Sequence, residues 1–161
     1  MTETTTASGR TRLEKLLEKS QDRHNPTTEE LEGILDSSHA IAVVGMSTNP
    51  AKPARRVPSY LAAHGYEIIP VNPTADRILG KPARNSLAEV TEPVDVVLVF
   101  RPSQEAAKVI EAAASRPERP VIWLQEGIRA DEEASRARGQ GIQVIQDLCA
   151  YKAHKALHGE D

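Results

Sequence analysis

The clearest structural signal in this chain is the stretch IAVVGMSTNPAKP, which spans residues 41–53. Its first four residues form a short apolar run, which is typical of a strand buried on both faces of a parallel sheet. Gly45 ends the run and permits a tight turn with close approach of the backbone. A helical spacing of apolar residues follows over 53–64, so the region predicts a strand, a turn and a helix in succession.

Further apolar runs repeat this arrangement at 68–71, 94–100, 121–124 and 142–145. Helical patterns separate these runs, and strands that alternate with helices indicate βαβ units. We therefore predict an α/β domain over residues 38–152. Its architecture is expected to be a three-layer, Rossmann-like, doubly wound parallel sheet of about five strands.

The segments on either side of this domain have a different character. Residues 1–10 are rich in Thr and lack apolar spacing, which predicts a disordered tail. Residues 11–37 predict a helical extension, whose second helix begins with a capping box of Thr27 and Glu30. Residues 153–161 are expected to form a C-terminal tail.

Length and composition narrow the class of protein. The 161 residues suggest one domain, and a net charge of −3 with only 3% aromatic residues argues against a nucleic-acid partner. No apolar run approaches the ~20 residues of a membrane span, and the N-terminus lacks a secretory signal. We therefore expect a cytoplasmic protein with no membrane partner, as a homo-oligomer or with a partner enzyme subunit if it assembles at all. The single cysteine, Cys149, excludes an internal disulfide and a cysteine-rich zinc site.

The turn after the first strand carries groups that suit an anion. In open parallel sheets, ligands bind beyond the carboxyl ends of the strands. Gly45 allows close approach, Ser47 and Thr48 offer hydroxyls, and Lys52 adds positive charge near the free N–H groups of a helix N-terminus. These features indicate a phosphate-binding turn, and the alternative is an ordinary strand-to-helix loop.

The same turn departs from the common nucleotide fingerprints. The later glycines of G-x-G-x-x-G would fall at positions occupied by Ser47 and Pro50. NAD also needs a carboxylate for its ribose after the second strand, and none occurs before Asp76. No Gly-Lys-Ser/Thr follows Gly45, so the P-loop pattern is absent as well. NAD is therefore the weaker interpretation.

Basic and aromatic residues mark the other strand ends. Arg101 directly follows the third strand, where it would either meet a phosphate or pair with a neighbouring carboxylate. Phe100 and Trp123 lie at strand ends, where they would either wall a pocket or pack in the core. A wider set of cations fits a polyanionic small ligand, although some members, such as Arg56, are expected to be simply solvated. This set comprises Lys52, Arg55, Arg56, Arg77, Lys81, Arg84 and Arg101.

Taken together, the strand ends resemble one family. In chain order they read V-V-G-x-S-x-x-P-x-K, G-Y-E-I-I-P-V-N-P, I-L-G-K-P, S-L-x-E-V, V-D-V-V-L-V-F-R and V-I-W-L-Q-E-G-I. This series resembles the small coenzyme A-binding proteins, which are stand-alone relatives of the N-terminal CoA-binding domain of the succinyl-CoA synthetase alpha subunit. The resemblance covers residues 38–152 and implies a Rossmann-like domain that binds CoA or an acyl-CoA.

The resemblance also implies ligand contacts at four strand ends. Residues implied to face the pyrophosphate are Gly45, Ser47 and Lys52, and those implied to border the adenosine are Val71, Asn72 and Pro73. The third strand end is implied to contribute Phe100 and Arg101, and the last contact loop Trp123, Gln125 and Gly127. The chain departs from the family after the last strand, where Leu148 replaces the charged residue that commonly precedes the cysteine.

No catalytic or metal-binding constellation can be assembled from the predicted strand ends. All five histidines fall elsewhere, and no Ser-His-Asp set, carboxylate pair or metal-ligand spacing occurs there. We therefore predict a non-catalytic module that binds CoA or an acyl-CoA. The alternatives are an NAD- or nucleotide-binding oxidoreductase-like enzyme and the CoA-site subunit of a multi-chain acyl-CoA ligase. A further alternative is a redox protein in which Cys149 forms a mixed disulfide with the CoA thiol, against the simpler interpretation of an inert buried thiol.

Overall fold

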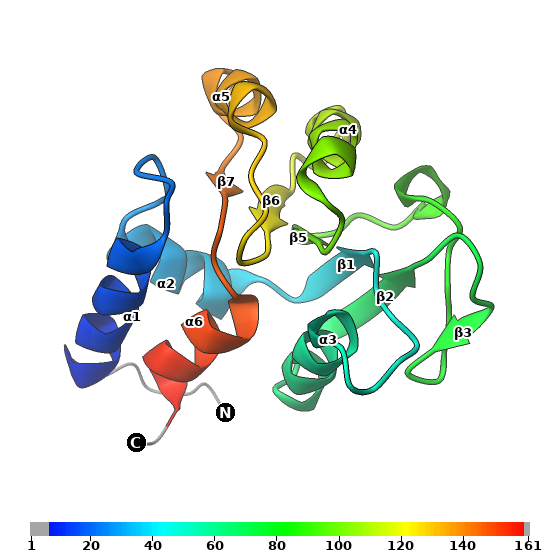
Figure 1. The fold of residues 1–161 in the computed structure, drawn as a ribbon, viewed down its shortest axis with the longest axis horizontal. Coiled ribbons are helices and arrows are strands. Elements are labelled where there is room, and N and C mark those ends of the chain that lie inside the picture. Colours follow the sequence, from blue (N-terminus) through cyan, green and yellow to red (C-terminus); the bar gives the residue numbers. More distant parts are fainter. Residues whose placement is uncertain (1–6, 160–161) are drawn as a thin grey trace.

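A five-stranded parallel sheet forms the centre of the computed structural model, which describes residues 7–159 (Figure 1). The strand order is β2-β1-β5-β6-β7, and each neighbouring pair is parallel. The predicted α/β class and Rossmann-like parallel sheet are therefore confirmed. The strands are β1 (Ala40–Val44), β2 (Glu67–Val71), β5 (Val96–Val99), β6 (Val121–Leu124) and β7 (Val144–Ile145).

Helices cover both faces of this sheet, which explains why its strands are continuous apolar runs. Alternate residues of β1 enter different cores: Ile41 and Val43 pack on one side and Ala42 on the other. The first face is covered by α1 (Ala7–Lys19), α2 (Thr28–Ser37), α3 (Pro53–Ala63) and α6 (Ala150–His158). The second is covered by α4 (Ser103–Ala114), α5 (Asp131–Gly139) and the 3₁₀ turn η1 (Leu87–Glu89) (Figure 1).

The strand order creates a switch point between β1 and β5. From β1 the chain first builds outward to β2, and it then returns to add β5, β6 and β7 on the opposite side. In open α/β sheets, ligands commonly bind at such a reversal, beyond the carboxyl ends of the strands. The loops that flank this point are residues 45–52 after β1 and residues 100–102 after β5.

An additional two-stranded antiparallel hairpin follows β2, which the sequence pattern did not predict. Its strands are β3 (Arg77–Ile78) and β4 (Lys81–Pro82). Both turn residues, Leu79 and Gly80, have positive φ, at 55° and 71°. A two-residue turn of this kind usually has Asn or Asp before the glycine, so leucine at that position concealed the hairpin.

The terminal helices are integral parts of the domain. Helix α1 begins at Ala7, inside the predicted tail, and the capping box of Thr27 and Glu30 is present at the start of α2. Helix α6 runs through the predicted boundary at residue 152, because Ala153 and Leu157 are fully buried against the same core cluster as Leu13 of α1. Residues 1–6 and 160–161 lie outside the described residues.

None of the helices within residues 7–159 has the length and apolar character needed to cross a membrane.

Arg12 of α1 is expected to stabilise the fold by capping α6. Its guanidinium donates to the carbonyl oxygens of Ala156 (2.9 Å) and Gly159 (3.1 Å) at the C-terminus of that helix. Replacing Arg12 with Met should lower the free energy of unfolding by about 1–2 kcal/mol, because the terminal carbonyls lose a charged donor. Urea denaturation checks this, with Lys15→Met on the exposed side of α1 as the control, which should stay within about 0.5 kcal/mol of wild type. Equal losses in the two variants would contradict the capping role.

Candidate functional site

Gly45 joins the ends of the two central strands. Its φ is +84°, and its N–H donates to the Val71 carbonyl at 3.0 Å. An added Cβ at this position would lie 2.7 Å from Cδ of Arg101 and 3.3 Å from the carbonyl carbon of Phe100. Gly45 is therefore required both by its backbone conformation and by the closeness of the loop after β5.

The loop after β1 is tied to helix α3 by an unusual backbone bond. The N–H of Ser47 donates to the carbonyl of Ala54 at 3.1 Å. In a regular helix that carbonyl would accept from residue 58, but Pro58 has no N–H. The proline inside α3 thus frees an acceptor that fixes the loop above it.

Side chains stabilise the remainder of this loop and link it to the end of β2. The hydroxyl of Ser47 accepts the Asn49 N–H at 3.0 Å. Asn72 donates from its amide to the Met46 carbonyl at 2.9 Å, while its side-chain oxygen accepts the N–H groups of Thr74 and Ala75. The three strand ends at Gly45, Asn72 and Arg101 are therefore brought together, as predicted for one edge of a parallel sheet.

Positive charge without an acidic partner gathers on the first turn of α3. Lys52 is the N-cap of this helix, and its side chain makes no capping hydrogen bond. Within residues 7–159, no carboxylate forms an ion pair with Lys52, Arg55 or Arg56. The backbone N–H groups of Lys52, Arg55 and Arg56 already donate to carbonyl oxygens, and Pro53 has no N–H. The favourable environment for a phosphate therefore comes from the side-chain cations and the partial positive charge of the helix N-terminus.

Two other cations of the expected set are neutralised by carboxylates. Arg84 contacts both oxygens of Glu92 at 2.8 Å, and its hydrogen bonds lower the pKa of Glu92 to about 2. Arg101 forms an ion pair with Glu105 at 2.5 Å, so of the two roles predicted for Arg101 the structure shows the carboxylate pair. Arg77 donates to the Gly80 carbonyl in the β3–β4 turn. Fewer cations of the expected set are therefore available to a ligand than the sequence suggested.

At the end of β6, two of the predicted site residues turn their side chains into the core, so that the backbone of the following loop is what remains at the carboxyl edge of the sheet. Trp123 is only 2% exposed, and its indole N–H donates to the Leu148 carbonyl at 2.8 Å, so this side chain packs in the core. The side-chain oxygen of Gln125 is buried and accepts the Ala150 N–H at the start of α6. Phe100 is half-buried against the core on the α3 side of the sheet. Gly127 is exposed with φ of +85° and leaves only backbone groups at the turn.

Asp147, which follows the last strand and was expected only to hold structure by hydrogen bonds, fixes this last loop of the predicted site. The carboxylate of Asp147 accepts the Gly127 N–H at 2.6 Å, although the two residues are twenty positions apart. A local pattern contains no signal for such a contact. The effect of Pro58 was detectable, because a proline in a helical pattern always leaves one carbonyl without its usual donor.

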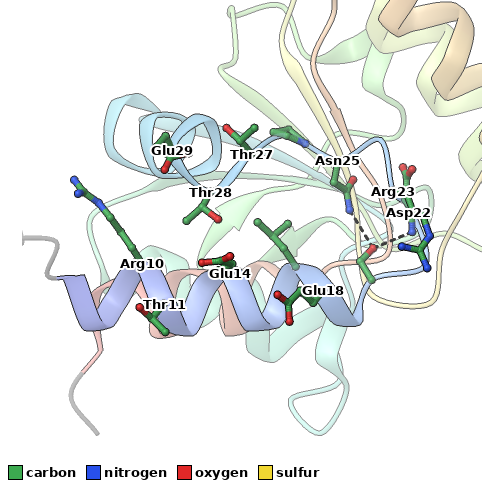
Figure 2. A pocket seen from close by; sticks show the side chains of 13 residues that line it. Arg10, Thr11, Glu14, Glu18, Asp22, Arg23, Asn25, Thr27, Thr28 and Glu29 are labelled. Carbon is green, nitrogen blue, oxygen red and sulfur yellow. Dashed lines mark hydrogen bonds between the residues drawn. The ribbon is translucent and has the colours of Figure 1, made fainter.

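A separate hollow of about 490 Å³ lies between α1, α2 and their connecting loop (Figure 2). Its lining mixes both signs of charge, because Arg10 and Arg23 line it together with Glu14, Glu18 and Glu29. Arg10 is also paired with Glu32 at 2.8 Å. This hollow therefore lacks the excess positive charge that a polyphosphate ligand needs.

The histidines of the described chain form no metal site. His64, His154 and His158 gather beside Tyr60 where α3 meets α6, with ring centroids of neighbouring histidines 5.0–5.2 Å apart. Tyr60 and His154 share a hydrogen bond of 2.8 Å. Among residues 7–159 no group of three or more His, Cys, Asp or Glu side chains is arranged to hold a metal ion.

Comparison with known proteins identifies the family of the chain. Residues 39–155 match the family model described as a CoA binding domain. The chain belongs to this family of CoA-binding domains. The suspected resemblance is thereby confirmed, and the match extends past the boundary predicted at residue 152 into α6.

Relatives of this CoA-binding domain occur both alone and within larger enzymes. The protein YneT of Bacillus subtilis (strain 168) is 42% identical over 130 residues, which are 81% of this chain and 96% of YneT. A solved structure from Thermus thermophilus is 37% identical with a TM-score of 0.74, covering 79% of this chain and 96% of that one. The dinucleotide-forming acetyl-coenzyme A synthetase 1 of Ca. Korarchaeum cryptofilum is 25% identical with a TM-score of 0.61. That match covers 80% of this chain but 30% of the synthetase.

The tight packing at Gly45 predicts an unusually costly substitution. Gly45→Ala and Gly127→Ala both place a side chain at nearly the same positive φ, 84° and 85°, which should cost about 1–2 kcal/mol in each variant. Of these two positions, Gly45 alone has neighbouring atoms within 4 Å of the added Cβ. Gly45→Ala should therefore lose roughly a further 1–3 kcal/mol through displacement of Arg101. Urea denaturation of both variants measures the difference, and equal losses would show that the approach of Arg101 imposes no constraint.

Proposed function

We propose that this protein binds CoA or an acyl-CoA at the carboxyl edge of its sheet and carries out no chemistry of its own. The observation that carries the proposal is the Gly45 turn. This turn lies at the β1–β5 switch point and is hydrogen-bonded to Asn72 through the Met46 carbonyl. It also borders the cations of α3, for which the described residues offer no ion pair. The family match and the relationship to an acetyl-coenzyme A synthetase support CoA as the ligand class.

The chemistry of CoA suits the arrangement of this edge. CoA carries a pyrophosphate and a 3′-phosphate, so it needs several cations and backbone N–H donors. We assign the pyrophosphate to Gly45, Ser47 and Lys52, and the adenosine to the segment after β2. The residues of that segment are Val71, Asn72 and Pro73.

The pantetheine arm is apolar and contains amides, which suits the opposite side of the crevice. Here the half-buried ring of Phe100 and the stem of Arg101 offer apolar surface. The backbone of the loop after β6 offers hydrogen-bonding groups, with Gly127 at its turn. In the proposal, Trp123 and Gln125 do not touch the ligand. They support the site by hydrogen bonds that hold the end of β6 to the start of α6 and the residues before it.

Calorimetric titration of the purified protein with CoA, acetyl-CoA, NAD and ATP tests the proposal. We expect saturable binding of CoA or acetyl-CoA and at least about tenfold weaker binding of NAD, because the acid and glycines that NAD needs are missing. Preference for NAD would favour the oxidoreductase-like alternative. Absence of CoA and acetyl-CoA binding would overturn the proposal.

A pair of arginine and lysine variants tests which cations meet the ligand. Lys52→Ala should weaken CoA binding by about tenfold or more, the usual effect of losing a charged hydrogen bond. Arg84→Ala should leave the affinity within about twofold, because Glu92 already engages Arg84. The same titrations with dephospho-CoA locate the contact. If Lys52→Ala weakens both ligands equally, Lys52 lies at the pyrophosphate, and if it weakens CoA more, it lies at the 3′-phosphate.

A second role is favoured by the synthetase relative, in which the matching region is 30% of a larger chain. In this role the protein would supply a CoA site to a separately encoded acyl-CoA ligase. Affinity capture on the CoA-loaded protein, followed by an assay of captured material for acyl-CoA formation, tests the idea. Captured material without such activity would contradict it.

A further inference from the structure

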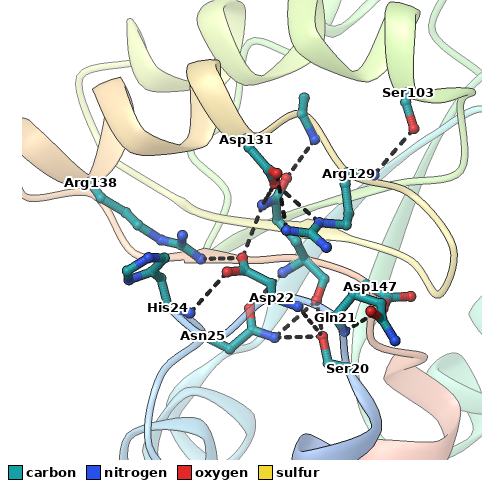
Figure 3. Close-up of polar contacts among 12 residues, drawn as sticks. Ser20, Gln21, Asp22, His24, Asn25, Ser103, Arg129, Asp131, Arg138 and Asp147 are labelled. Atoms are coloured by element: carbon teal, nitrogen blue, oxygen red, sulfur yellow. Dashed lines mark hydrogen bonds and ion pairs between the residues drawn. The ribbon is translucent and has the colours of Figure 1, made fainter.

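Three distant segments meet beside the loop of residues 125–130, which connects β6 to α5. They are residues 20–25 after α1, the loop itself, and residues 146–147 after β7 (Figure 3). The first segment precedes the region that matches the family model, which begins at residue 39. Its contacts therefore connect a part of the chain outside the family match to a loop of the proposed ligand site.

Asp147 stands at the centre of this junction. One carboxylate oxygen accepts the Gly127 N–H at 2.6 Å, and the other accepts the Gln21 N–H at 2.8 Å. The backbone N–H of Asp147 also donates to the Ile128 carbonyl at 3.3 Å. Its φ is +54°, a left-handed conformation that aspartate adopts more readily than most residues but at a greater cost than glycine, so the surrounding contacts help to impose it.

Gln146 reinforces the junction from the core side. Its side chain is nearly fully buried, and its oxygen accepts the Ala130 N–H at the end of the loop at 2.6 Å. The carboxamide of Asn25 both donates to the Gln146 carbonyl (2.9 Å) and accepts its N–H (2.8 Å), as a neighbouring strand would. Ser20 adds a hydroxyl bond to the same carbonyl at 3.0 Å.

A buried carboxylate closes the network. Asp22 is 4% exposed and accepts hydrogen bonds from Arg138, Gln146 and the backbone of His24. Burial would by itself raise the pKa of Asp22, but these donors outweigh it and hold the pKa below its ordinary value. The Asp22 carboxylate is therefore charged and fully hydrogen-bonded. Its bonds to Arg138 of α5 and to Gln146 after β7 hold residues 20–25 against these two elements.

We propose that Asp147 is a positioning residue that latches the 125–130 loop for the ligand, and that residues 20–25 form the second arm of this latch. The inference rests on the proposed function, because it takes the loop as a ligand contact. The carboxylate holds Gly127 on one side and Gln21 on the other, so displacement of either arm loosens the other. The N-terminal segment thus takes part in ligand binding without touching the ligand.

Two variants of Asp147 separate the latch from overall stability. Asp147→Gly removes both acceptors but also relieves the left-handed strain, so the urea midpoint should stay close to wild type. Hydrogen exchange at the Gly127 amide, measured by NMR without ligand, should accelerate about tenfold or more, and CoA affinity should fall about tenfold. Asp147→Asn keeps one oxygen acceptor and tolerates positive φ, so both effects should be smaller.

A double variant tests the second arm. Ser20→Ala with Asn25→Ala removes the side-chain hydrogen bonds of residues 20–25 to the backbone of Gln146 and should reduce CoA affinity several-fold, although both residues lie outside the proposed site. Arg10→Ala is the matched control, since it breaks an exposed ion pair between Arg10 of α1 and Glu32 of α2, away from residues 20–25, and should leave the affinity unchanged.

The outcomes distinguish the latch from the proposed function. Wild-type Gly127 exchange in folded Asp147→Gly would overturn the latch whatever the ligand. Faster exchange with unchanged CoA affinity, or unchanged affinity in the Ser20/Asn25 variant, would overturn the positioning role. Absence of CoA binding by the wild-type protein would instead overturn the proposed function and, with it, the ligand part of this inference.

Discussion

Burial of β1 on both faces is the constraint on which the rest of the structure depends. Its side chains alternate between two cores, so helices must cover each side. Its edges are paired as well, with β2 on one side and β5 on the other, and the order in which the chain adds them creates the reversal. That reversal leaves the loops after β1 and β5 facing one another across a narrow gap. Glycine suits this position because its φ is positive, and because a Cβ there would lie 3.3 Å from the Phe100 carbonyl carbon and would displace the stem of Arg101. Packing in the core thereby determines the shape of this edge of the sheet.

Electrostatics then selects which part of that edge suits an anion. The chain has a small net negative charge, and several of its arginines are engaged by carboxylates, as Arg84 is by Glu92. Three cations without an ion pair among the described residues, Lys52, Arg55 and Arg56, lie together at the start of α3, where the helix N-terminus adds its own partial positive charge. The start of α3 is therefore a more favourable environment for an anion than the net charge of the chain alone would suggest.

The sequence predicted what depends on local pattern and missed what depends on long-range contact. Apolar runs located all five parallel strands, and glycine at the end of β1 located the central turn. The hairpin of β3 and β4 escaped because leucine occupies a left-handed position. Trp123 could not be assigned to core or pocket from sequence alone, since either environment suits a large aromatic ring. Asp147 and Asn25 act across more than a hundred residues of chain or between loops, where periodicity carries no information.

Pro58 shows that the shape of the β1–α3 loop is not encoded in the loop alone. The carbonyl that holds Ser47 is available because a residue eleven positions later lacks an N–H. Grafting residues 45–53 onto another parallel sheet would transfer the chemical groups but not the conformation that arranges them. A graft that keeps this conformation must therefore also include Ala54 and Pro58. The unit that determines the shape of the turn is thus longer than the sequence motif of the turn itself.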